Sequence, residues 1–530
     1  MRTLAWALAL AAACLLAGAC AAPTPTPEPT PTPTFAPTPT ADVGPPSDGA
    51  LRVAAVGAAP HRDLHRLVSE WATLFGPGLA YSRLLRFEAG PRAAQPGMHV
   101  ACDLCQAWRV SPDGLTYEFD LHPDAAWASA DGALTRGVTA QDVAFSLERL
   151  RTPGLPHAWL LAAVEDIEVA SDAAVRLRLR YPDADLPQKL ASPYAVVMAP
   201  EAVGADLRTG PVISSGPWLF DQGASGQVWL TAREDYHRPG EPSVSALEIV
   251  PVRDFATGAA FLRAGQVDAA QVSAREWAEL AGGDIRSVVV RRQGFGVAFG
   301  MNVRDGPLAD AAVRRALFAA LDPWAALGAL DRPAWVGVGV PVIEPDWLLP
   351  DEELRRVFRG EQAGGGVAAL TLTVANFGEG YAAHGEALAA QMRDTSFDVT
   401  VEVVSRSAYF QRVWEERDFE AFVGPLPPVT TTGSFLLGLV HGDGAQNVFG
   451  HQDAALDALI EAQAAEPDAA RRGVLVREAQ QRILDDAFLF MPAIAAERWA
   501  YGPGVIDFAP NMPAGAGDFW RYARLEEASE

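Results

Sequence analysis

Residues 115–121, LTYEFDL, alternate strictly between apolar and polar side chains. A period of two places the apolar side chains on one face of a strand, which is then buried on that face and solvated on the other. The four residues before it, SPDG at 111–114, have proline and glycine where a type I turn prefers them. The pattern therefore predicts a tight turn followed by a half-buried strand.

A helix is predicted to begin after Thr139, in the sequence VTAQDVAFSLERL. The Thr139 side chain is suited to cap the free amide groups of the first turn, and Asp142 follows three residues later near the positive end of the helix dipole. Val143, Leu147 and Leu150 have the i, i+4, i+7 spacing of one helical face. Turn, strand and capped helix together predict an α/β or α+β protein.

Similar patterns occur along the rest of the chain. Alternating or apolar runs predict strands, and i, i+4 stripes predict helices between them. The predicted strands are Leu51–Val56, Val175–Tyr181, Leu370–Val374, Val399–Val403 and Phe419–Val423, and the predicted helices include Gly385–Arg393 and one capped by Asp310. In the helix capped by Asp310, we interpret Arg314 as a structural ion-pair donor rather than a catalytic residue.

The N-terminus has the pattern of an exported lipoprotein. Residues 1–3 form a short basic segment, and residues 4–17 carry no polar side chain. An apolar run of this length is typical of a signal peptide and too short for a membrane span. Ala17–Cys20 then resembles a lipobox, in which the cysteine receives a lipid and becomes the first residue of the mature protein. We therefore predict Cys20 as the lipid attachment site, with an ordinary secretory cleavage nearby as the alternative.

A proline-rich segment separates this start from the rest of the chain. Residues 23–46 contain ten prolines, mostly alternating with threonine. Such a segment buries little apolar surface and has few backbone donors, so we expect an extended tether of the polyproline type.

The composition restricts the possible functions. With 42 basic and 66 acidic residues the formal net charge is −24, which argues against binding nucleic acid or an anionic membrane through the globular body. Lys189 is the only lysine, so the chain has no Walker loop and any ATP hydrolysis belongs to a partner. The H-E-x-x-H, G-x-S-x-G and dinucleotide G-x-G-x-x-G motifs are also missing from the sequence. We expect no enzyme activity, no metal and no cofactor.

Several segments, in the same order, resemble the extracytoplasmic solute-binding proteins of ABC importers, specifically family 5, the peptide, nickel and oligosaccharide-binding type. The resemblance rests on Asp113–Tyr117 for a D-G-L-T-Y segment, Val138–Ser146 for V-T-A-x-D-V-x-x-S and Ser214–Phe220 for G-T-G-P-Y/W. It implies an α/β, two-lobed periplasmic-binding-protein-like fold of type II, with an extra subdomain in the first lobe and a hinge between the lobes.

The resemblance also implies a domain organisation, with crossings between the lobes near Gly300 and Pro492. The expected segments are a signal peptide at 1–19, a lipid-anchored Pro/Thr-rich linker at 20–49, a first lobe at 50–297 with an inserted subdomain at about 88–185, a second lobe at 298–492, and a return to the first lobe at 493–530.

The implied function is that of a lipoprotein outside the cytoplasm, in the periplasm or on the outer face of the cytoplasmic membrane. It is expected to be a monomer that binds a peptide-like or other polar small molecule and delivers it, by hinge closure, to ABC permease subunits whose ATPase lies in the cytoplasm. One alternative is the same fold acting as a solute receptor for a signalling partner. Another is a secreted glycoside hydrolase built on two carboxylates, because acidic residues are plentiful.

Two pairs of residues have spacings that suggest further chemistry. Cys102 and Cys105 form a C-x-x-C, for which a local disulfide, two buried thiols, or redox or metal chemistry all remain open. The resemblance places Cys105 where a small buried alanine usually lies, which favours a structural role. His61 and His65 are spaced i, i+4, as in a metal pair on a helix, but two surface histidines are the preferred interpretation.

The resemblance further implies which residues line the ligand cleft. They come from the loop after the first strand, from later first-lobe segments, from the crossing and from a second-lobe loop. The predicted ligand-binding residues are His61, Asp63, Tyr81, Ser214, Ser215, Phe295, Thr430, Thr431 and Thr432.

One departure from the family pattern concerns the second-lobe loop. Peptide-binding relatives have W-x-x-D-Y-P-D-P after this strand, and its first aspartate pairs with the α-amino group of the peptide. Residues 424–432 read GPLPPVTTT instead and contain no acid. Because a buried ammonium ion needs a paired charge, we expect free-amino peptides to bind poorly unless another carboxylate, such as Asp443 or Asp63, folds into the same place.

Overall fold

The structure is a computed structural model that describes residues 49–526, except 59–60, 94–96, 131–134, 205, 331–332, 338–343, 359–367, 378–379 and 428–429. The predicted signal sequence, Cys20 and the proline-rich linker lie outside the described residues. In the part of the chain that is described, no helix has both the length and the apolar character needed to cross a bilayer.

The main sheet is mixed and, within the described residues, has eleven strands. The first-lobe strands are, in spatial order, β11 (Trp218–Gln222), β12 (Val228–Ala232), β13 (Ala246–Val252), β1 (Ala50–Val56) and β14 (Ala269–Val272). The shared strands β20 (Leu489–Tyr501) and β15 (Arg286–Met301) follow, and then the second-lobe strands β19 (Ala421–Pro425), β17 (Ala368–Ala375) and β18 (Phe397–Val404), with β16 (Ala334–Gly337) paired to β20. The strands predicted near 51, 370, 399 and 419 are all present.

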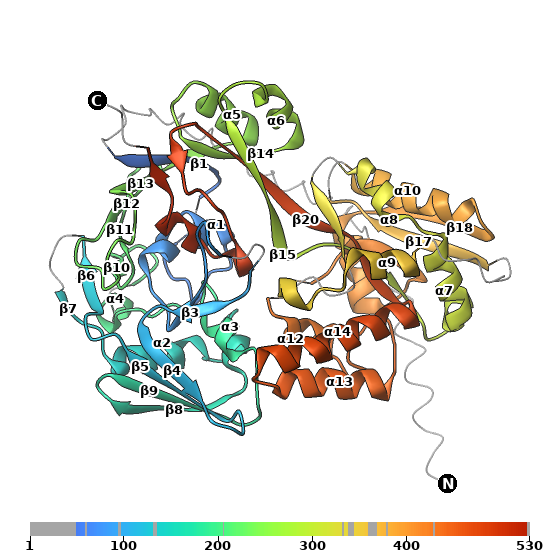
Figure 1. The fold of residues 1–530 in the computed structure, drawn as a ribbon, viewed down its shortest axis with the longest axis horizontal. Coiled ribbons are helices and arrows are strands. Elements are labelled where there is room, and N and C mark those ends of the chain that lie inside the picture. The colour runs from blue at the N-terminus through green and yellow to red at the C-terminus, as the bar shows by residue number, and fades with distance from the viewer. Residues whose placement is uncertain are drawn as a thin grey trace, which may run out of the picture. The chain divides into compact units, whose positions relative to one another are not determined.

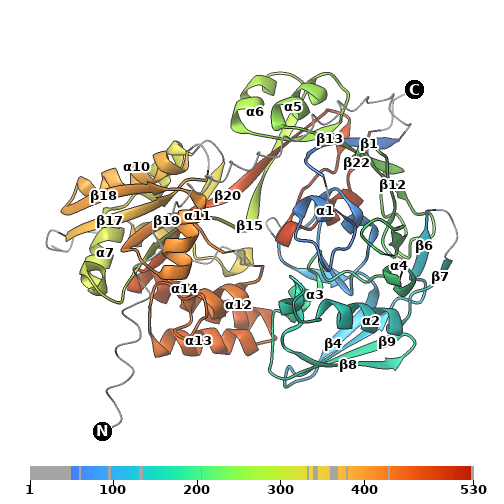
Figure 2. The same cartoon turned by 180° about the vertical axis from the view of Figure 1, so that it is seen from behind.

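The strands β15 and β20 belong to both lobes (Figures 1 and 2). Up to Arg291, β15 pairs with the last residues of β20, and from Val297 onward it also pairs with β19. The register shifts between Arg291 and Gly296, and a bulge of this kind bends and twists a strand. Gly300 and Pro492, near which crossings were predicted, both lie in this antiparallel pair of strands, and the mixed α/β fold is two-lobed.

A separate four-stranded sheet contains the strand that was predicted after the turn at 111–114. Its order is β4 (Cys105–Val110), β5 (Thr116–Leu121), β9 (Ala174–Leu179) and β8 (Val164–Ser171). Tyr117, Phe119 and Leu121 are buried, as the period of two requires. The helix α2 (Ala140–Leu150) has Thr139 as its N-cap, and Asp142 completes the capping box in both directions.

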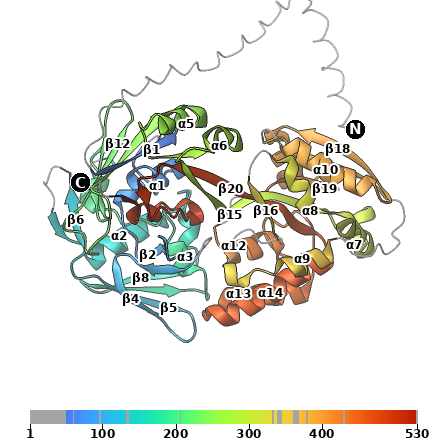
Figure 3. The ribbon, with the colours of Figure 1, turned by 45° about the horizontal axis from the view of Figure 1, so that its top comes forward.

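The other elements cover the sheets. The first-lobe helices are α1 (Glu70–Leu74), α3 (Leu186–Leu190), α4 (Pro200–Gly204), α5 (Phe255–Arg263) and α6 (Ala274–Leu280). A three-stranded sheet has the order β10 (Ile213–Ser214), β6 (Ala126–Ser129) and β7 (Thr135–Gly137). Two further sheets pair β2 (Leu85–Phe87) with β3 (Val100–Cys102), and β21 (Val505–Ile506) with β22 (Arg524–Leu525). Second-lobe helices are α7 (Ala311–Ala320), α8 (Pro323–Ala326), α9 (Asp351–Val357), α10 (Tyr381–Arg393), α11 (Arg406–Tyr409), α12 (Thr432–Phe435), α13 (Ala454–Ala465) and α14 (Ala469–Asp486). Figure 3 shows α10 on one side of the second-lobe strands and α13 and α14 on the other.

Asp310 caps α7, as predicted, but the role predicted for Arg314 is wrong. The buried guanidinium donates to the carbonyl groups of Asp486 at 2.9 Å, Leu308 at 2.9 Å and Ala309 at 3.0 Å. Arg314 therefore satisfies free backbone acceptors and forms no ion pair with the carboxylates of the described residues. Backbone carbonyl oxygens accept the hydrogen bonds of this guanidinium in place of the carboxylate that was expected.

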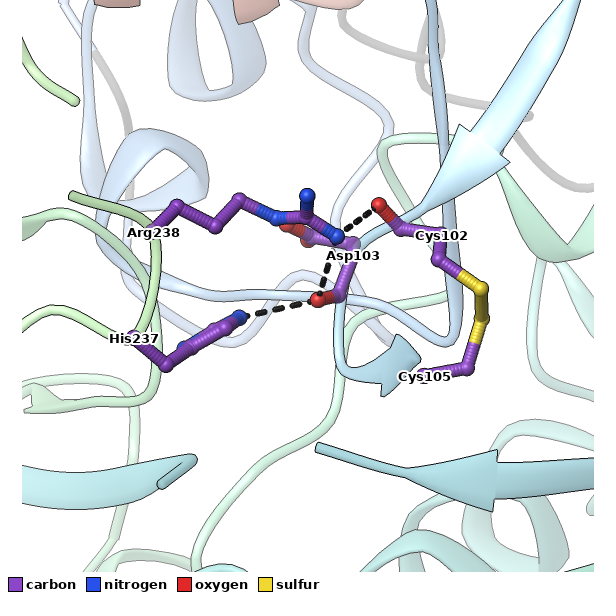
Figure 4. Close-up of a disulfide and its surroundings, with 5 residues drawn as sticks. All are labelled: Cys102, Asp103, Cys105, His237 and Arg238. Carbon is purple, nitrogen blue, oxygen red and sulfur yellow. Dashed lines mark hydrogen bonds between the residues drawn. A yellow bond between two sulfur atoms is a disulfide. The ribbon is translucent and has the colours of Figure 1, made fainter. Parts of the chain in front are cut away.

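Cys102 and Cys105 are joined by a disulfide across the turn between β3 and β4 (Figure 4). The enclosed Asp103 is fully buried, and its carbonyl oxygen accepts hydrogen bonds from His237 Nε2 at 2.9 Å and from Arg238 at 3.1 Å. Arg238 also donates to the Cys102 carbonyl group. The turn brings the two sulfur atoms to the same side, which an extended strand does not permit for residues three apart.

The Asp103 carboxylate anchors the C-terminal segment to the first lobe. It accepts hydrogen bonds from the Arg83 amide at 2.9 Å, Arg521 at 3.1 Å and Tyr236 at 3.1 Å. Burial raises the pKa of Asp103, but the charges of Arg521 and Arg83 outweigh burial and hold the pKa far below its usual range. Asp518 belongs to the same network, because its carboxylate forms an ion pair with the Arg83 guanidinium at 2.5 Å.

Candidate functional site

A cavity of about 580 Å³ lies between residues of the two lobes. His99, Trp108 and Gln188 contribute from the first lobe, near β3, on β4 and on α3. Glu344, Trp347 and Arg472 contribute from the second lobe. We call it the interlobe cavity. Its volume lies in the range of small-molecule sites.

Beside the cavity, the loop before α3 contacts the second lobe at α12, α13 and α14. The carboxylate of Asp185 forms an ion pair with Arg472, and the two side chains are only 5% and 4% exposed. Arg472 also donates to the carbonyl group of Ala184 at 3.1 Å, and the Ala184 amide donates to the Ala464 carbonyl group at 2.8 Å. These four residues form what we call the interlobe clasp. Figures 1 and 2 both show α3 next to α12.

The charges of the clasp compensate each other. Burial raises the pKa of Asp185, but the charge of Arg472 and a hydrogen bond from Thr431 bring it below its ordinary value. Arg472 is further held by Gln463, whose side-chain oxygen accepts at 2.9 and 3.1 Å. Removing one partner of such a buried pair leaves an uncompensated charge.

Glu344 is a different kind of buried acid. The residue is 6% exposed, and one carboxylate oxygen accepts from the Met98 amide at 3.2 Å and lies 3.7 Å from His99 Nε2. No arginine or lysine of the described residues lies within ion-pair distance of it. Burial raises the pKa of Glu344, and the nearby His99 lowers it by less. This carboxylate is therefore desolvated with little compensation.

The remaining cavity wall combines indole rings with a free acceptor. Trp347 is 7% exposed, with the Arg472 guanidinium 5.3 Å from its ring, and Trp108 is half-buried. The side-chain oxygen of Gln188 is buried and accepts no hydrogen bond from the described residues. Such a wall suits a ligand with an apolar body and a few polar hydrogen atoms.

Asp63 and His61, predicted at the cleft, form local contacts instead. Both oxygens of Asp63 accept from Arg149, at 2.9 and 2.6 Å, and the Asp63 amide donates to His61 Nδ1 at 3.2 Å. His65 is buried with Nε2 3.0 Å from the Val196 carbonyl oxygen, and burial lowers its pKa to about 4. His61 and His65 are not in a helix, and His65 already has a backbone partner, so the pair has no metal-site geometry.

The predicted residues Tyr81, Ser214 and Ser215 are all buried in the first lobe. Ser215 accepts the Ser82 amide at 3.0 Å and so orders the chain around it. The hydroxyl groups of Tyr81 and Ser214 have no hydrogen-bond partner among the described residues, and burial raises the pKa of Tyr81. The side chain of Phe295 lies outside the described residues. None of the predicted residues whose side chains are described lines the interlobe cavity.

The three predicted threonines lie beside the clasp. Thr431 caps α12 by accepting the Ser434 amide at 3.2 Å and also contacts Asp185. Thr430 has a buried hydroxyl group without a partner in the described structure, and Thr432 is buried. This second-lobe loop therefore lies next to the contact between the lobes, and none of its three threonines lines the interlobe cavity.

Neither carboxylate considered as a substitute for the missing acid lines the interlobe cavity. Asp443 is exposed, and Asp63 is held by Arg149. Thr431 contacts the acid Asp185, which Arg472 already neutralises. Sequence reasoning missed Asp185, Arg472 and Glu344. Arg472 lies on the buried face of α14.

One group of possible metal ligands lies elsewhere, in His451, Asp453 and Asp486. His451 Nε2 is 3.1 Å from Asp486, but Asp453 already forms an ion pair with Arg482. A bound cationic side chain weakens the attraction of these residues for a metal ion. Their contacts with one another and with Arg482 are explained by a structural role.

Comparison with known proteins gives a consistent result. Residues 99–333 match the family "Bacterial extracellular solute-binding proteins, family 5 Middle". "Probable di/tripeptide-binding protein 5" of Pseudomonas aeruginosa is 31% identical over 46% of this chain and 49% of its own length. "Heme-binding protein A" of Haemophilus influenzae is 26% identical over 51% of this chain and 53% of its own length.

Solved structures show the same fold over most of the chain. HbpA2 from Haemophilus parasuis superposes with a TM-score of 0.76 at 19% identity, covering 90% of this chain and 100% of that one. The unliganded open form of the murein tripeptide-binding protein MppA has a TM-score of 0.74 at 16% identity, covering 90% and 97%. Residues 99–333 are therefore similar to the bacterial extracellular solute-binding proteins of family 5, and the solved structures show the same fold over about 90% of the chain. The chain matches about half the length of these two curated relatives.

Proposed function

We propose that the protein is the solute-binding component of an ABC importer, which takes up a peptide-like or other polar small molecule between its lobes and delivers it to permease subunits. The observation that supports this most directly is the interlobe cavity, walled by residues of both lobes and bordered by the clasp, in a chain whose residues 99–333 match this family. A ligand that contacts both walls favours the closed arrangement, because those contacts exist only when the lobes meet.

We also propose that the protein is anchored outside the cytoplasm. A lipid on Cys20 and the proline-rich linker hold the binding domain outside the cytoplasm, near the permease. The strongly acidic body is repelled by anionic lipid, so the lipid is the membrane contact. Delivery to the permease then requires release from the closed lobes while the anchor keeps the protein close to the membrane.

Two measurements test the binding role. Native mass spectrometry of protein purified from its own host identifies a co-purifying solute, and calorimetry with that solute gives the stoichiometry. Small-angle scattering of protein stripped of solute is then compared with the saturated protein, for which we expect a smaller radius of gyration. A saturated protein with an unchanged radius contradicts hinge closure, and loss of uptake when permease genes are deleted distinguishes import from signalling.

A further inference from the structure

Glu344 lines the interlobe cavity as a buried acid without a matched base. Its hydrogen bond from Met98 satisfies one oxygen, and His99, whose side chain is 52% exposed, is a weak partner at 3.7 Å. A carboxylate held in this way destabilises the ligand-free protein, since desolvation is compensated only in part. A cationic ligand at this point would supply the missing charge.

The other charges around the cavity leave room for such a cation. The charged wall residues with ion-pair partners are Arg472, with Asp185, and Glu466, with Arg471. Apart from His99, the other charged wall residues that the structure describes are two carboxylates, Glu344 and Asp346, and one guanidinium, Arg477, which donates to the Asp346 carbonyl group at 2.9 Å. Two acids against one base leave a net charge of −1, which favours a singly charged cation.

We propose that the interlobe cavity recognises an organic cation, with its charged nitrogen at Glu344 and its apolar body against Trp108 and Trp347. The proposal rests on the proposed function, because it assigns the solute class of the same cavity. Indole faces attract cations as well as apolar groups, and the unpaired oxygen of Gln188 offers an acceptor to a second polar group of the solute. The residue that supplies the charge lies far along the chain from the loop after β19, where an acid was expected.

The test compares charged and neutral forms of one probe. Calorimetry at pH 7 measures binding of phenethylamine, its N,N,N-trimethyl form and its N-acetyl form to solute-stripped protein. We expect both cations to bind at least tenfold more tightly than the neutral N-acetyl form. Comparable binding of the two cations shows recognition of charge rather than of an N–H donor.

Glu344→Gln removes the charge while its amide oxygen can still accept the Met98 amide. We expect it to weaken both cations by roughly a hundredfold and to leave the N-acetyl form unchanged. The matched control is Glu352→Gln on α9, whose side chain is 82% exposed and pairs with Arg356, and it should change nothing. A second readout is thermal stability without solute, which Glu344→Gln should raise because an uncompensated buried charge disappears.

The outcomes separate this proposal from the proposed function. Cations that bind Glu344→Gln as tightly as wild type, neutral probes that bind equally well, or no binding of any cation overturn the cation assignment. A neutral co-purifying solute that closes the lobes also overturns it while leaving the solute-binding function intact. If no solute of any class closes the lobes, the proposed function fails as well.

Discussion

Replacing Arg472 by Met should open the lobes without unfolding them. In the closed arrangement the variant leaves the Asp185 carboxylate buried and without its cation, since both side chains are at most 5% exposed. Removing one partner of a buried ion pair typically costs about 3–5 kcal/mol. Most of that cost falls on the closed arrangement, because opening returns Asp185 to water. Taking about 3 kcal/mol, the ratio of closed to open protein falls by roughly a hundredfold.

The assay uses the only lysine in the sequence. Lys189 on α3 is 14% exposed at its side chain and lies 2.6 Å from Asp183, which directly precedes the clasp residue Ala184. Opening removes Ala464 and Arg472 from this loop, so we expect faster acylation of Lys189, read by mass spectrometry of the peptide that contains it. Small-angle scattering of the same samples should show a larger radius of gyration.

Two further variants decide whether the clasp is responsible. Combining Arg472→Met with Asp185→Leu removes both charges and should restore part of the closed population, as a double-mutant cycle measures. Arg393→Met breaks the Glu386 pair, whose side chains are 37% and 53% exposed, and should leave Lys189 unchanged because exposed pairs contribute about 1 kcal/mol or less. Unchanged acylation and radius in Arg472→Met would refute the assignment of the clasp.

Three other outcomes follow from single features. Cys20→Ala should leave the body folded but free of the membrane, and a variant that still sediments with membranes contradicts lipid attachment. Thr139→Ala removes the N-cap of α2 and should lower the free energy of unfolding by about 1 kcal/mol in denaturant titration, with no loss expected from Thr139→Ser. Without solute, the free energy of unfolding should rise as the pH falls through the raised pKa of Glu344, and then decline as the pH approaches the lowered pKa of Asp185. Glu344→Gln should lack the rise. A pH profile identical to that of the wild type would contradict the assignment of the rise to Glu344.

Local sequence was sufficient for much of the fold. Thr139 and Asp142 are three residues apart, so the helix start they define depends on no distant contact, and the capping box is present. The strand at 116–121 likewise follows from its own alternation. The family resemblance supplied the two-lobed order that these elements cannot specify alone, and the solved structures with the same fold confirm it.

The chemistry between the lobes was decided by the tertiary structure. Arg472 and Asp185 are 287 positions apart, and Glu344 meets Met98 across 246 positions. Arg314 shows the same limit, because its partners are carbonyl groups that only the folded backbone brings together. A sequence reports which side chains are ionisable, but burial and pairing depend on which segments pack together. For that reason the sequence determined helices and strands, while the fold decided that Asp185 is neutralised by Arg472 and that Glu344 is buried without a matched base.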